Sequence, residues 1–332
     1  MRHRNYTLCV RVAWAVAVVG IGASAIAQSL LPSDDGWYAW PIDAVEGAEF
    51  RCCFHWDDNQ PKTKACKLDS IRTSYGNSDL APPSHGSAIV YAQKRDGAVV
   101  RVHTFSSSCE VTTREGIAGL GNVTPRQSLS LLEGALRDGV AQTHEAIGAI
   151  AMHTGDEAAR MLVRLADERE EKEVRKSAVF FMGQLRGAET ENELTNIMFT
   201  DPSDSMREHA AFSISESSLP NREDLLVRLG NEDPEPGVRG KAWFWLAQTE
   251  SPQVEGAIFA CLEAEASVKA RHEAIFALAQ LPEERAARAL IRVIESRDNS
   301  AADRKQALFW LAQGESDAGL DYLSRVLSTA GE

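Results

Sequence analysis

A seven-residue pattern that begins with alanine recurs along the chain at a nearly constant spacing. The five clear copies begin at Ala178, Ala210, Ala242, Ala274 and Ala307, which places them 32 or 33 residues apart. A degenerate sixth copy begins at Ala146, 32 residues before the first of these. A period of this length is typical of a solenoid, in which each unit buries its apolar face only by stacking on its neighbours.

Turn residues divide each repeated unit into two helices, with Gly155, Gly187 and Asp201-Pro202 as examples. We expect a mainly α solenoid over residues 124–330, with one helix at 125–137 followed by six helix pairs. Thr124-Pro125 is a helix start, because threonine caps a helix and proline fits its first turn. The lone helix should cap the N-terminal end. Four polar residues should finish the other end: Asp321, Ser324, Arg325 and Ser328.

An apolar residue and an arginine stand just ahead of the Ala-x-x-x-Leu-Ala core in several units. They are Val174-Arg175, Met206-Arg207 and Val238-Arg239. With this pattern, residues 126–330 resemble the HEAT-like repeats first noted in phycobilisome lyases. The resemblance implies an α-solenoid, but that class includes enzymes and binding scaffolds alike, so it leaves the function open.

Residues 1–27 have the pattern of an export signal. Arg2, Arg4 and Arg11 precede an apolar run that ends in Ala25-Ile-Ala27, a small-x-small cleavage site. The run is shorter than the roughly 20 residues that a membrane span needs, so we expect no stable span after cleavage. The sequence predicts an exported bacterial protein, either periplasmic in a Gram-negative cell or secreted.

Residues 28–120 should form a small β-rich, disulfide-containing domain. Two β-branched and aromatic runs, 88–93 and 98–105, flank an Asp-Gly turn and predict a hairpin. Cys52, Cys53, Cys66 and Cys109 are an even set, so two disulfides are expected in an oxidising compartment. A bond between the adjacent Cys52 and Cys53 would be strained, so each should pair with Cys66 or Cys109, in an order that stays open. A zinc site is the alternative, but there is no CxxC motif.

The formal net charge is −13, and residues 126–332 alone hold 23 basic and 36 acidic residues. An acidic solenoid repels nucleic acid and anionic membrane surfaces. The charge therefore argues against a nucleic-acid partner.

An arginine recurs with the same period: Arg175, Arg207, Arg239, Arg271 and Arg304. From the second copy onward an acid lies six residues ahead of it: Asp201, Asp233, Glu265 and Asp298. We expect a structural ladder, in which charge-assisted bonds to acids and turn carbonyls tie neighbouring units together. The alternative is an anion-binding stripe.

A phenylalanine stands two residues after each clear leading alanine: Phe180, Phe212, Phe244, Phe276 and Phe309. A glutamine stands four residues later in most units: Gln184, Gln248, Gln280 and Gln313. At about 100° per residue, both rows lie away from the face that holds the alanines. Either the rings pack laterally between units, or they form a partly exposed stripe that binds another protein.

Two His-Glu pairs, His144-Glu145 and His272-Glu273, resemble motifs of deoxyhypusine hydroxylase, a HEAT-like di-iron enzyme. The other units hold different residues at these places, so the implied set of iron ligands is incomplete. His55, His85 and His103 could bind a metal together with Asp57 or Asp58, but they show no metal-ligand spacing, and we expect them at the surface.

The sequence therefore predicts no catalytic site, no metal and no cofactor. The favoured function is an exported scaffold or adaptor that holds a polypeptide partner, whose identity stays open. The alternatives are a HEAT-like enzyme, either a metal-dependent oxidoreductase or a bilin lyase, and a structural component of the envelope stress response.

Overall fold

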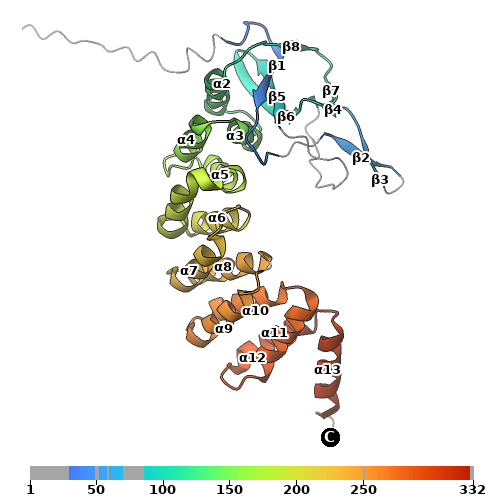
Figure 1. Ribbon diagram of the computed structural model, residues 1–332, viewed down its shortest axis with the longest axis vertical. Helices are drawn as coiled ribbons and strands as arrows, with labels where there is room; N and C mark the ends of the chain where they lie inside the picture. Colours follow the sequence, from blue (N-terminus) through green and yellow to red (C-terminus); the bar gives the residue numbers. More distant parts are fainter. Residues whose placement is uncertain (1–29, 49–51, 58–59, 70–85, 250, 330–332) are drawn as a thin grey trace, which may run out of the picture.

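The computed structural model describes residues 30–48, 52–57, 60–69, 86–249 and 251–329. The predicted export signal lies outside these ranges. A β module stands at one end of a stack of paired helices, and the stack ends in α13, Asp317–Thr329 (Figure 1). Within the described ranges, no helix has both the length and the apolar character needed to cross a membrane.

The β module is built on a four-stranded sheet. Its order is β6 (Ala98–Ser106), β5 (Ser87–Arg95), β1 (Gly36–Asp43) and β8 (Ile117–Gly119). β8 runs parallel to β1, and the other neighbours are antiparallel. The predicted hairpin is β5–β6, and both turn residues, Asp96 and Gly97, have positive φ (50° and 85°), as a tight right-twisted hairpin requires. The smaller pairs are β2 (Phe54–Asp57) with β3 (Gln60–Thr63), and β4 (Cys66–Lys67) with β7 (Val111–Thr112).

The two faces of the sheet enter different cores, because side chains alternate along a strand. Trp40, Val90 and Val102 point to one face and join the core of the helices. Trp37 and Phe105 belong to a separate cluster on the other face, together with Cys53 and Cys66, and Cys109 packs against it. One side of the sheet is therefore a wall of the solenoid core.

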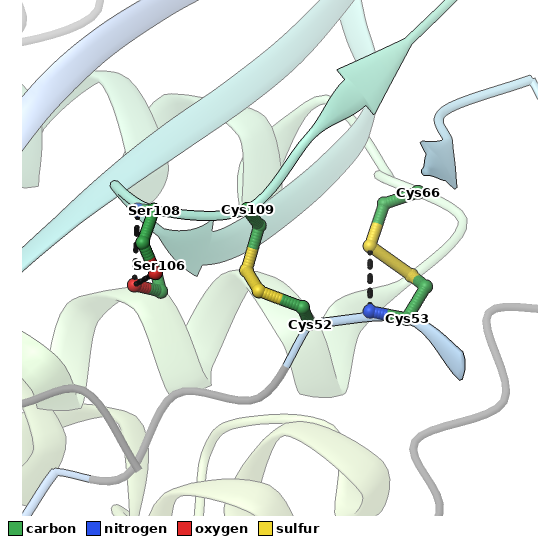
Figure 2. The surroundings of a disulfide bond; sticks show 6 residues. All are labelled: Cys52, Cys53, Cys66, Ser106, Ser108 and Cys109. Atoms are coloured by element: carbon green, nitrogen blue, oxygen red, sulfur yellow. Dashed lines mark hydrogen bonds between the residues drawn. A yellow bond between two sulfur atoms is a disulfide. The ribbon is translucent and has the colours of Figure 1, made fainter. Parts of the chain in front are cut away.

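Two disulfides close the outer cluster, as expected, and their order is now defined. Cys52 bonds to Cys109 and Cys53 bonds to Cys66, with Cα–Cα distances of 5.2 and 5.1 Å. Figure 2 shows the adjacent cysteines joined to different parts of the module. The first bond ties the segment before β2 to the turn after β6, and the second ties it to β4.

A buried polar network fixes the β module to the helices. The indole Nε1 of Trp40 donates to Ser128 Oγ (2.6 Å), which also lies 2.8 Å from His153 Nε2. His153 Nδ1 lies 2.7 Å from the carbonyl oxygen of Ala149, and burial lowers the pKa of His153. All three network side chains are at most 1% exposed. Because every polar atom of this junction has a partner, the junction is specific rather than merely apolar.

The described helices follow the predicted order of one helix and six pairs. α2 (Pro125–Arg137) starts with a capping box between Thr124 and Gln127. The pairs are α3 (Thr143–Met152) with α4 (Asp156–Leu165), the two halves of α5 (Lys172–Thr200), α6 (Asp204–Ser215) with α7 (Arg222–Glu232), α8 (Pro236–Gln248) with α9 (Val254–Ala264), α10 (Val268–Ala279) with α11 (Glu283–Glu295), and α12 (Ala301–Leu311) with α13. The first helices α3, α6, α8 and α10 follow one another on one side of the stack (Figure 1).

The turn expected at Gly187 is a break within α5 rather than a separate loop. Arg186 leaves the helical conformation there (φ −132°, ψ 21°). Its buried guanidinium donates to the carbonyl oxygens of Ala151 and His153 and to the carboxylate of Glu189. The break therefore also joins the second unit to the first.

All six leading alanines are fully buried, at 0% exposure. A methyl group at this position lets neighbouring helices approach closely, and the apolar residue four positions later packs beneath it. The register expected from the repeat is therefore present in the structure.

The C-terminal end of the stack exposes the four predicted polar residues, but they do not cover it completely. Asp321, Ser324, Arg325 and Ser328 are exposed, but so are apolar residues beside them. Leu308 is 37% exposed, Leu320 55% and Leu327 72%. The reason is that the last described pair has no further unit packed on it, whereas the β module covers the other end.

Candidate functional site

Each ladder arginine inside the stack binds two units at once. Arg207 donates from Nε and Nη2 to the carboxylate of Asp233 (2.7 and 3.1 Å) and from Nη1 to the carbonyl oxygen of Asp201 (2.9 Å). Arg239 repeats this with Glu265 (2.6 and 2.9 Å) and with the carbonyl oxygen of Asp233 (2.8 Å). The acid six residues ahead thus supplies its backbone, and the acid of the following turn supplies the carboxylate.

The two ends of the arginine row differ from the middle. Arg175 pairs with Asp201 and donates to the carbonyl oxygen of Ala166. Arg304, at the other end, donates to the carbonyl oxygen of Asn299, and no carboxylate of the described residues lies within ion-pair distance of it. The row is therefore closed at its start and open at its end.

The assignment of Asp298 to the ladder is wrong. Arg271 pairs instead with Asp303 (2.7 Å), which also closes a capping box with Ser300 at the start of α12. The leading alanines of these two units are 33 residues apart rather than 32. The extra residue in the turn removes Asp298 from the position that the other acids occupy, and the first turn of the next helix supplies the carboxylate instead.

Inside the stack, the ladder does not offer an anion site. Arg207 and Arg239 direct their donors to protein acceptors, and Asp201 and Asp233 are buried. These bonds tie neighbouring units together, and acceptors of the protein itself occupy the arginine donors.

The phenylalanines combine lateral packing with exposure. Phe180 stacks on Phe212 with ring centroids 5.9 Å apart, and Phe244 stacks on Phe276 at the same distance. These four rings remain half-buried, and Phe309 is 53% exposed. Both interpretations left open by the sequence therefore describe part of what is seen.

A second set of aromatic residues bridges the stacked pairs. Trp245 lies 4.7 Å from Phe212 and 4.8 Å from Phe244, measured between ring centroids. Trp310 stands in the same way between Phe276 and Phe309 (4.8 and 5.0 Å). We call these residues wedges, since each fills the space between two phenylalanines of neighbouring units.

The first unit follows the same rule with different residues. Phe181 is the wedge between His144 and Phe180, at 4.7 and 5.0 Å. Gly148 occupies the place of the phenylalanine in this unit, and a Cβ there would lie 2.7 Å from the ring of Phe181. The degenerate first copy of the repeat therefore makes room for its neighbour.

Together these rings form a continuous row across six units, which we call the aromatic stripe. Its members are His144, Phe180, Phe181, Phe212, Phe244, Trp245, Phe276, Phe309 and Trp310. The four predicted glutamines, Gln184, Gln248, Gln280 and Gln313, are all exposed near its edge. The phenylalanines could be predicted from the sequence, whereas the wedges were not predicted.

Near the middle of the stripe is a groove of about 330 Å³. Phe212, Phe244 and Trp245 form its apolar wall, and Lys241 and Glu208 are among its polar residues. Burial raises the pKa of Glu208, with nearby Lys241 opposing the shift. Aromatic walls with a few charged groups are typical of binding surfaces rather than of packed interiors.

The histidines do not come together. His144 and His272 lie on different first helices, α3 and α10, and within the described residues no group of three or more His, Cys, Asp and Glu is placed to hold a metal. That the protein uses no metal or cofactor and is not an enzyme stays a prediction.

His103 is not at the surface, contrary to expectation. It is 1% exposed between Trp37 and Phe105, and burial lowers its pKa to about 4. The pattern of β6 places it on the outer, disulfide-bonded face, where the neighbouring cluster covers it. His85 and the side chain of His55 lie outside the described residues.

No protein-family model matches the sequence, and comparison with curated proteins gives no match. Among solved structures, human deoxyhypusine hydroxylase in complex with glycerol is similar over 62% of this chain and 79% of its own, at 20% identity and a TM-score of 0.27. Kap121p is similar over 62% of this chain and 25% of its own, at 13% identity and a TM-score of 0.33. Both likenesses are too weak to bear on function. The assignment to a mainly α solenoid follows from the helix pairs themselves.

Proposed function

We propose that this protein is a scaffold that holds a polypeptide partner along the aromatic stripe. The main support is continuity, since rings from six consecutive units touch one another on one face while most stay partly exposed. An exposed apolar surface of that length marks an interaction site. Aromatic side chains also carry much of the binding energy at protein interfaces.

The spacing of the stripe suits an extended chain. Packed helices lie roughly 8–10 Å apart, and a strand rises about 3.3 Å per residue, so a bound segment would advance about three residues per unit. The exposed glutamines offer amide donors and acceptors to its backbone. The pattern of one stacked pair and one wedge repeats every two units, so equivalent subsites would recur about every six residues of the bound segment.

We also infer that the protein is exported. The two disulfides support this, because such bonds persist in oxidising compartments, and residues 1–27 have the pattern of a signal. The chemistry predicts that thiol alkylation in intact cells will label none of the four module cysteines. Labelling of all four would contradict export.

The function is tested by site-specific photo-crosslinking in cells. A crosslinker at Gln248, exposed beside the stripe, should capture one defined partner, whereas one at Ala260, exposed on α9, should not. A Phe244→Glu, Phe276→Glu variant with a native circular dichroism spectrum should lose the crosslink. If that variant unfolds, Phe309→Glu replaces it, because this ring is more than half exposed.

A partner captured equally from Gln248 and Ala260, or retained by the folded variant, would contradict the proposal. If no stoichiometric partner is captured at all, a structural role in the envelope becomes the better account.

A further inference from the structure

A cleft opens at the C-terminal end of the aromatic stripe, between the turn that joins α10 to α11 and the turn that joins α12 to α13. Its volume is about 480 Å³. That size falls within the range of ligand pockets, roughly 300–1,000 Å³. Trp310, the last wedge, lines both the cleft and the stripe, and so the two surfaces are continuous.

The floor of the cleft is apolar. Ala286, Ala287 and Leu290 of α11 and Leu311 of α12 are buried there, at 8% exposure or less. A floor of methyl and methylene groups suits the aliphatic part of a long side chain.

The rim of the cleft is acidic. Glu283 and Glu315 both line it and both are exposed, and the lining contains no lysine or arginine. Basic groups on the neighbouring helix turns are engaged elsewhere, with Arg285 on Glu255 (2.5 Å) and Arg288 near Glu284 (3.9 Å). Among the described residues, neither rim carboxylate has a basic partner within ion-pair distance. Both can therefore form an ion pair with a basic group of another molecule.

Two further features favour a cation that belongs to a peptide. The ring of Trp310 can attract a cation, and the net charge of −13 draws cations toward the protein from a distance. Gln280 and Gln313, members of the glutamine row, stand at the rim and offer amides to the backbone of a bound chain.

The geometry points to this cleft as a subsite for a lysine or arginine side chain of the polypeptide partner. The methylenes lie on the floor of Ala286, Leu290 and Leu311, and the charged head meets Glu283 and Glu315 at the rim. This inference rests on the proposed function, and it adds that the partner carries a basic residue next to the segment that covers the stripe.

The probe for the test is n-butylammonium, which reproduces the lysine side chain, with n-butanol as its uncharged match. Binding is followed through the indole ¹H–¹⁵N NMR signal of Trp310, assigned by its loss in Trp310→Phe. We expect n-butylammonium to move this signal saturably and n-butanol to bind at least about fivefold more weakly. Raising the salt from about 50 to about 500 mM should weaken the first and leave the second unchanged.

A Glu283→Gln, Glu315→Gln variant should bind n-butylammonium at least about fivefold more weakly than wild type. Glu284→Gln is the matched control, since Glu284 is the next residue along, is exposed and does not line the cleft; it should change binding less than about twofold. Equal binding of n-butanol, or wild-type affinity in the double variant, would overturn the subsite. The titration uses no partner, so it can fail while the crosslinking result stands, and the reverse also holds.

Discussion

The arginine ladder and the aromatic stripe run along the same first helices with the same period, yet the structure uses them differently. Arg207 and Arg239 are paired with carboxylates and turn carbonyls of two units. Phe212 and Phe244 touch their neighbours and still face solvent in part. Periodicity alone therefore does not separate a structural row from a binding row. The difference is that neighbouring units satisfy the hydrogen-bond donors of the arginines, whereas they leave part of both phenylalanine rings exposed to solvent.

The largest effect should come from the core to which both rows are attached. Ala242 is fully buried among the helices, so Ala242→Glu would force a carboxylate into close packing and should unfold much of the array. Thermal unfolding followed by circular dichroism measures this. Gln248→Glu is the matched control, because it adds a charge at an exposed position of the same helix and should leave the midpoint nearly unchanged. A wild-type midpoint for Ala242→Glu would mean that the register is wrong.

The next effect separates the closed part of the ladder from its open end. Arg207→Met leaves the buried carboxylate of Asp233 without its partner and should cost about 3–5 kcal/mol of unfolding free energy. Arg304→Met removes a side chain with no carboxylate partner in the described structure and should cost less than about 1 kcal/mol. Urea denaturation gives both values. Equal costs would show that pairing with a carboxylate is not what makes the ladder arginines stabilise the fold.

Features set by spacing within one unit could be predicted from the sequence. The 32-residue step and the buried alanines fixed the helix pairs, and the arginine row followed from the same step. The even number of module cysteines predicted two disulfides. Which cysteines pair depends on how β4 and β7 meet. Cys66 and Cys109, which belong to different disulfides, lie far apart in sequence, and only the folded module places each beside its own partner.

Features that depend on two units or on a changed turn could not be predicted in this way. The wedges Phe181, Trp245 and Trp310 recur only in alternate units, and small residues such as Ser213 stand between them. A search for a feature shared by every unit overlooks them, although a step of about 64 residues would have found them. Asp303 replaced Asp298 because one extra residue in a turn changes which acid reaches the arginine.

The smallest expected effect is a difference in pH dependence between His209, which lies beside the aromatic stripe, and Glu265 of the ladder. Burial lowers the pKa of His209, which lies beside Phe212, so the unfolded chain takes up protons first as the pH falls below about 6.5, and unfolding free energy declines from there. In the ladder, bonds from Arg239 lower the pKa of Glu265, so its contribution is held until the pH falls below about 4.5 and is lost through the folded pKa. Other buried histidines, among them His144 and His153, and other paired carboxyls, among them Asp303, titrate in the same two windows. His209→Gln should therefore reduce the loss of stability in the upper window alone, and Glu265→Gln the loss in the lower one. Urea titrations at pH 7.5, 5.5 and 3.5 would show this, and a single window altered by both variants would mean that the two rows are one electrostatic unit.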